Sequence, residues 1–77
     1  MNEREEETKA VVDQFNTVIQ QTQEVVRRLS SLQRQAKAGR PFGDEEIRQL
    51  SSAYDRCVIA IRNGQDAIYH WANKWIA

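Results

Sequence analysis

Apolar residues recur through the first half of the chain at spacings that alternate between four and three. With Thr22 included, they are Val11, Phe15, Val18, Thr22, Val25, Leu29, Leu32 and Ala36. Such spacing marks one face of a helix and extends over more than three heptads. No Gly or Pro interrupts residues 2–37, and Asn2 and Glu5 have the spacing of a helix N-cap and its reciprocal glutamate. The pattern predicts a helix over about residues 3–37.

The same spacing returns after a short interruption. Gly39 can adopt the left-handed conformation that ends a helix, and Pro41 cannot continue one. Beyond the interruption, the apolar series consists of Ile47, Leu50, Tyr54, Cys57, Ile61, Gly64, Ile68, Trp71 and Trp75. We therefore predict a turn at residues 38–43 and a second helix over about residues 44–76.

The Asn63-Gly64 pair leaves a break in the second helix as an alternative. This dipeptide is a common turn signal, and Gly in a helix interior costs about 1 kcal/mol relative to Ala. The spacing nevertheless resumes in register at Ile68. We favour one continuous helix with a local weak point at Gly64.

A connection of about six residues makes two helices of similar length antiparallel neighbours. The predicted fold is all-α: a long antiparallel helical hairpin in which residues 1–77 form a single domain. Folding about the connection is expected to place residue i near residue 83 − i. Thr22 would then face Ile61, and Phe15 would face Ile68.

The two flanks of this apolar series differ in polarity. One flank is mostly polar on the first helix, with Gln14, Gln21, Arg28 and Gln35, opposite Ala53, Ala60 and Ala67 of the second. The other flank is apolar and consists of Val12, Ile19, Val26, Val58 and Ala72. Two hairpins would bury this arc in a four-helix bundle, so we expect these five residues to form a homodimer interface. A different helical partner and a closed monomer are the alternatives.

Chain length and charge limit the classes of function. A chain of 77 residues buries little surface alone, and its single cysteine supplies neither an intrachain disulfide nor a zinc site. The 11 basic and 11 acidic side chains cancel, so no overall field attracts nucleic acid or an anionic membrane. No apolar run is long enough for a membrane span, and the first thirteen residues are mainly acidic. We expect a cytoplasmic protein.

No residue pattern points to catalysis. Cys57 lies in the apolar series, where a free cysteine usually acts as a small buried residue. His70 is the only histidine and has no neighbouring ligand pattern. The Glu residues cluster in first helical turns, where the helix dipole accounts for them. We predict no catalytic residue, metal ligand or cofactor, and a protein that is not an enzyme.

A basic stretch is the candidate for nucleic-acid binding. Residues 27–43 contain five basic residues and no acidic one, and four of them are candidate phosphate contacts: Arg27, Arg34, Lys37 and Arg40. The alternative is a positively charged helix end that faces the acidic start of the second helix. We rank nucleic acid below protein as a partner.

The C-terminal aromatic cluster is the candidate for protein binding. Tyr69, Trp71, Trp75 and Ile76 lie within eight residues at the open end of the hairpin. Trp and Tyr often dominate binding energy at interfaces. We expect Tyr69 and Trp75 to contribute mainly to binding and Trp71 to the fold. The alternative is that a dimer covers all of them.

These observations favour a noncatalytic regulator or adaptor that binds, and masks, part of a larger protein. A structural or chaperone subunit of a secretion or phage assembly is the first alternative. A dimeric helical hairpin that binds RNA or DNA is the second.

Overall fold

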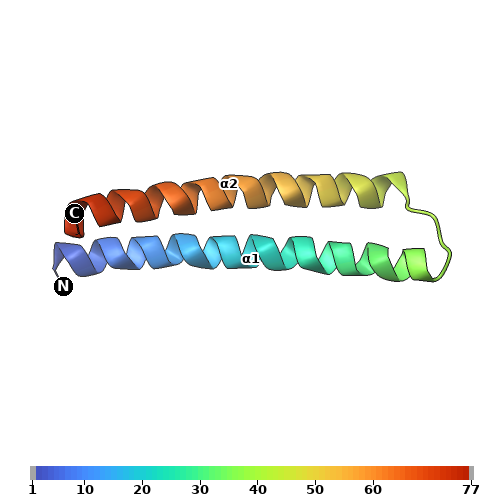
Figure 1. The fold of residues 1–77 in the computed structure, drawn as a ribbon, viewed down its shortest axis with the longest axis horizontal. Coiled ribbons are helices and arrows are strands. Elements are labelled where there is room, and N and C mark those ends of the chain that lie inside the picture. Colours follow the sequence, from blue (N-terminus) through green and yellow to red (C-terminus); the bar gives the residue numbers. More distant parts are fainter. Residues whose placement is uncertain (1, 77) are drawn as a thin grey trace.

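The computed structural model describes residues 2–76 and consists of two long helices. Helix α1 spans Glu3–Lys37 and helix α2 spans Asp44–Trp75, and the two run antiparallel along their whole length (Figure 1). The molecule is a rod of 56 × 18 × 17 Å. The predicted all-α helical hairpin is confirmed, and α2 continues without a break through Asn63 and Gly64. Over the described residues, neither helix is apolar enough to cross a membrane.

Local sequence signals set the helix ends. The side chain of Asn2 caps α1 by accepting a hydrogen bond of 2.8 Å from the backbone N–H of Glu5. At the other end, Gly39 has φ +73°, the left-handed conformation that Gly adopts at little cost. The backbone N–H of Arg40 then donates to the Gln35 carbonyl at 2.9 Å, which closes the last turn.

The contact between the helices is formed by smaller residues than the sequence suggested. The buried residues are Val11, Val25, Leu32, Ala53, Cys57, Ala60 and Gly64. Ala53 is 0% exposed, whereas Phe15 and Tyr54, which we expected in the contact, are at least 40% exposed. The contact is therefore rotated toward the flank of Ala53, Ala60 and Ala67 that was expected to lie outside it. Small side chains allow the helix backbones to approach closely, and larger ones at these positions would hold the helices apart.

The register also differs from the expected one. Val18 faces Gly64, one residue from its expected partner. Thr22 Oγ1, however, lies 3.7 Å from Cys57 Sγ, four residues from the expected Ile61. The indole N–H of Trp71 donates to Thr8 Oγ1 at 2.9 Å in the same register. At the loop, α1 extends beyond the level at which α2 begins (Figure 1).

Gly64 lies where the helices come close together. A Cβ atom at this position would lie 3.1 Å from Val18 Cγ2, closer than nine in ten real contacts of this kind. Gly64 thus weakens α2 locally but allows the side chain of Val18 to pack against its backbone.

We predict that the effect of Gly64→Ala on stability depends on Val18. Alanine should gain up to about 1 kcal/mol in helix propensity, but the stiff β-branched Val18 side chain must shift to admit the new methyl group. In a Val18→Ala background, the full gain should appear. Urea denaturation of both pairs at equal protein concentration measures the difference. Equal gains in both backgrounds would show that the contact with Val18 is not limiting.

Candidate protein-binding surface

One broad side of the hairpin is apolar and exposed. We call this the apolar face, and it comprises Val12, Phe15, Ile19, Thr22, Val26 and Leu29 of α1 with Ile47, Tyr54, Val58, Ile61, Gln65, Ile68 and Ala72 of α2. These residues lie at helical spacing beside the contact between α1 and α2. Phe15 and Ile19 line one open groove with Ile61 and Ile68, so both helices contribute to the same side.

The apolar face contains large side chains that the hairpin leaves uncovered. Ile19, Val26 and Val58 are 52%, 54% and 52% exposed. None of its residues is charged, although 22 of the 77 side chains in the chain are Lys, Arg, Asp or Glu. The structure brings the residues of the predicted dimer interface together here, with Ala72 half-buried and Val12 exposed. Their role as an interface stays a prediction.

The groove on the apolar face has a volume of about 420 Å³. Gly64 contributes only backbone to it, and Val18, which packs against that backbone, lines the groove together with Phe15 and Ile68. Its lining is apolar except for Gln65. A groove of this composition suits aliphatic or aromatic side chains from another helix.

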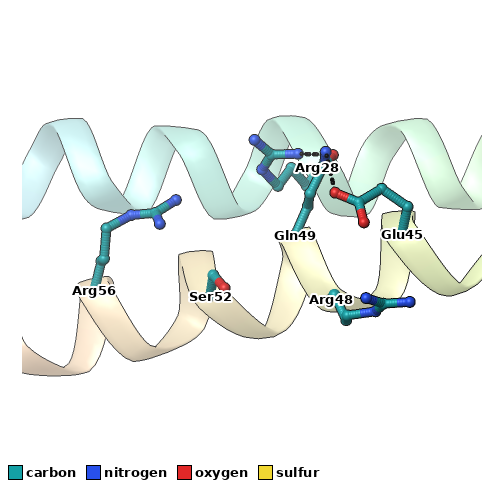
Figure 2. Close-up of a pocket in the computed structure, with 6 residues that line it drawn as sticks. All are labelled: Arg28, Glu45, Arg48, Gln49, Ser52 and Arg56. Atoms are coloured by element: carbon teal, nitrogen blue, oxygen red, sulfur yellow. Dashed lines mark hydrogen bonds between the residues drawn. The ribbon is translucent and has the colours of Figure 1, made fainter.

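The opposite side of the hairpin is polar and charged. Figure 2 shows a shallow hollow there in which Arg28 reaches from α1 toward a group of α2 residues. Arg28 Nη1 donates to Gln49 Oε1 at 2.8 Å, and Gln49 Nε2 donates to Glu45 Oε1 at 3.2 Å. These bonds tie the two helices together and orient Arg28. Among residues 2–76, no three His, Cys, Asp or Glu side chains are grouped as metal ligands would be.

The predicted phosphate contacts are divided between two environments. Arg27 forms an ion pair with Glu24, and Glu24 also pairs with Arg28 Nε at 2.7 Å. Arg34, Lys37 and Arg40 are exposed at the loop end and make no ion pair within the described part of the chain. The structure therefore leaves three of the four predicted residues free of internal partners.

The two tryptophans join the chain ends. Both are half-buried, and the indole N–H of Trp75 donates to Glu7 Oε2 at 2.7 Å. Lys74 Nζ lies 2.6 Å from Glu7 Oε1, and the Arg4 guanidinium lies 5.7 and 5.9 Å from the Trp71 and Trp75 ring centroids. We call this group the terminal contact. Trp75, which we expected to contribute mainly to binding, is half-buried beside Glu7 of α1.

Tyr69 and Ile76 point away from the terminal contact. They are 61% and 70% exposed, more than the other large apolar residues of the described chain. Gln65 Nε2 donates to Tyr69 Oη at 3.5 Å, which places Tyr69 beside the edge of the apolar face. The four residues of the predicted partner site are thus divided, with two joining the helices and two facing outward.

Glu7 and Lys74 make the terminal contact depend on pH. The hydrogen bond from Lys74, and then that from Trp75, lowers the pKa of the Glu7 carboxyl. Hydrogen bonds to Glu3 and Glu7 raise the pKa of Lys74. The ionised Glu7 carboxylate therefore stabilises the terminal contact at pH values above its ordinary pKa of 4.5. This stabilisation is lost as the pH falls through the lowered pKa. The protonated Lys74 ammonium stabilises the same contact fully at pH values below its ordinary pKa of 10.5. This stabilisation is lost as the pH rises through the raised pKa.

We predict that acid releases the indole of Trp75 before the hairpin unfolds. Its indole N–H resonance should hold its position at neutral pH and move toward the free value below pH 4.5 as Glu7 is protonated. Glu7→Gln should remove most of this pH dependence. Glu6→Gln, a change in the same helical turn but outside the terminal contact, is the matched control. A titration unaffected by Glu7→Gln would contradict the assignment.

Comparison with known proteins adds no relative from which a function could be transferred. The chain matches no protein-family model, no curated protein and no solved structure. Its function is therefore inferred from its own surfaces.

Proposed function

We propose that this protein is a noncatalytic protein-binding module, a regulator or adaptor that acts in the cytoplasm by binding, and masking, part of a larger protein. The observation that supports this proposal is the exposed and uncharged apolar face. Large side chains such as Ile19 and Val58 remain half exposed there, while Ala53 is fully buried between the helices. Apolar surface that is concentrated on one side of a molecule marks an interaction site.

The size of the apolar face fits a specific interface. Its α2 part, from Ile47 to Ala72, is about 38 Å long at 1.5 Å per residue. With a molecular width of 18 Å, this length gives a projected area of roughly 700 Å², and a standard interface buries about 800 Å² per partner. Burial of one Val, Leu, Ile or Phe side chain contributes about 1.5–3 kcal/mol, so a few of these residues can offset the cost of association.

Tyr69 and Ile76 are the residues we assign to contact with the larger partner. Ile76, the C-cap residue of α2, follows Tyr69 by seven residues, and both side chains are exposed. Tyr combines a rigid apolar ring with a hydroxyl and is over-represented among residues that dominate binding energy. Trp71 and Trp75 support this surface by holding the helix ends together.

A structural or chaperone subunit would use the same apolar face. Nucleic-acid binding is a second candidate that rests on a different observation, the unpaired Arg34, Lys37 and Arg40 at the loop end. Three such residues can contact only a few phosphates, and the Glu24 carboxylate partly neutralises the positive charge of the neighbouring Arg27 and Arg28. Protein binding accounts for more of the surface.

We predict that Val58→Glu abolishes association while Ile59→Glu does not. These neighbours are similarly exposed, but Val58 lies on the apolar face and Ile59 lines a hollow on the opposite side with Thr17 and Asn63. A charge in a desolvated interface should weaken binding at least about a hundredfold. Sedimentation and affinity capture measure the effect, and circular dichroism checks that both variants remain helical. Equal loss or equal retention would reject the apolar face as the binding surface.

We also predict that Tyr69→Ala and Ile76→Ala weaken capture of the larger partner by about tenfold to a thousandfold. Both side chains are exposed, so the helicity and sedimentation of the variants should not change. Ile59→Ala on the opposite side is the matched control for loss of an exposed apolar residue. A pull-down with mass spectrometry identifies the partner, and titration with that protein gives the affinities. Unchanged affinity for both variants would remove this end of the hairpin from the binding surface.

A further inference from the structure

We propose that a second copy of this chain occupies the apolar face, docked antiparallel so that the loop of each copy lies over the chain ends of the other. This inference rests on the proposed role of the apolar face in binding. It specifies the occupant and its orientation, and both follow from how charge and apolar residues are arranged along the rod.

Charge is separated along the length of the hairpin although the net charge is zero. Residues 27–48, the loop end, contain six basic and three acidic side chains, which gives +3. Residues 2–13 and 66–76, the terminal end, contain three basic and six acidic side chains, which gives −3. The remaining charged residues, Glu24, Asp55, Arg56 and Arg62, cancel. The antiparallel fold collects these segments at opposite ends (Figure 1).

This separation favours one orientation of two docked hairpins. If both loops lay at the same end, +3 would face +3 and −3 would face −3. With the loops at opposite ends, each positive end faces a negative end. Most of these charges are exposed and screened beyond about 8 Å at physiological salt, so they select the orientation more than they supply affinity. The uncharged apolar face between them supplies the buried area.

The apolar face is placed for such a docking. Its α1 part, Val12–Leu29, is centred between Gln20 and Gln21, and its α2 part, Ile47–Ala72, is centred between Ile59 and Ala60. The observed register, with Thr22 at Cys57 and Val18 at Gly64, puts these two centres at the same level of the rod. A two-fold axis that crosses both helices at this level, perpendicular to the rod, places the apolar face of the second copy on that of the first with the two ends exchanged. Apolar surface then meets apolar surface over its full length, as an isologous interface requires.

The sizes of the side chains fit two kinds of contact: a close one between α1 and α2 within each copy, and a wider one between the two copies. Small residues such as Ala53 and Ala60 hold α1 close to α2 within each copy. The larger Phe15, Leu29 and Ile61 remain to fill the space between copies, where each helix would pack on its own counterpart.

Sedimentation and spin-label distances test the inference. In a Cys57→Ala chain, Ala38→Cys places one nitroxide at the exposed loop end without changing any charge. Residue 38 lies about 26 Å along the helix from the proposed axis, so an antiparallel dimer should give a label separation of about 50 Å. A parallel dimer should give less than half of that. Adding Val58→Glu to the labelled chain should remove the signal at this label separation, because the dimer no longer forms. Adding Ile59→Glu should leave the signal unchanged.

Three results are possible, and each is decisive. A dimer at micromolar concentration with the long label separation supports the inference. A dimer with the short separation overturns the antiparallel orientation. A monomer overturns the second copy as occupant, and the capture experiment with Val58→Glu and Ile59→Glu then decides separately whether the apolar face binds another protein. The Cys57→Ala chain must match the original chain in helicity and sedimentation for this comparison.

Discussion

The close contact between α1 and α2 at Ala53, Ala60 and Gly64 determines the rest of the structure. Because these residues are small, the helices approach until Val18 touches the backbone at Gly64. This approach fixes which side of each helix faces inward. The larger neighbouring residues, including Phe15 and Tyr54, remain at least 40% exposed and form the apolar face. The fold and the candidate binding surface therefore have the same origin.

The sequence predicts the elements of this fold well because strong local signals set them. Asn2, Gly39 and Pro41 mark where helices start and stop, and the regular apolar spacing carries α2 through Gly64. The contact face was predicted only in part. Val11, Val25, Leu32, Cys57 and Gly64 are buried as the apolar series predicted, but the contact on α2 is rotated toward Ala53 and Ala60. Apolar residues cover an arc wider than one helix-helix contact, so spacing alone allows several rotations of each helix. Side-chain volume decides among them, and a ranking by hydrophobicity passes over Ala53 and Ala60 in favour of larger residues. The alternation of small residues on α2 was the available signal.

The chain ends illustrate a second limit of sequence analysis. Tyr69, Trp71, Trp75 and Ile76 were treated as one cluster because they are close in sequence. In the structure, Glu7 and Thr8 accept hydrogen bonds from the two indoles, which separates the tryptophans from Tyr69 and Ile76. Proximity in sequence does not show which of these side chains meet the other helix. The paired Glu7 and Lys74 also show why counting charges missed the terminal contact, since the count does not reveal which charges meet.

The energetics of the hairpin connect its folding to its association. Among residues 2–76, the contact between the two helices buries only seven residues, and on α2 these are small: Ala53, Cys57, Ala60 and Gly64. Helix stability in proteins comes mostly from packing of an amphipathic face. In this chain, the large side chains of the apolar face remain exposed in the single copy. Burial of that face against other helices would stabilise α1 and α2 at the same time as it forms the interface. A substitution on the apolar face such as Val58→Glu should therefore reduce association and thermal stability together, whereas a change in the terminal contact should act on the helix ends alone.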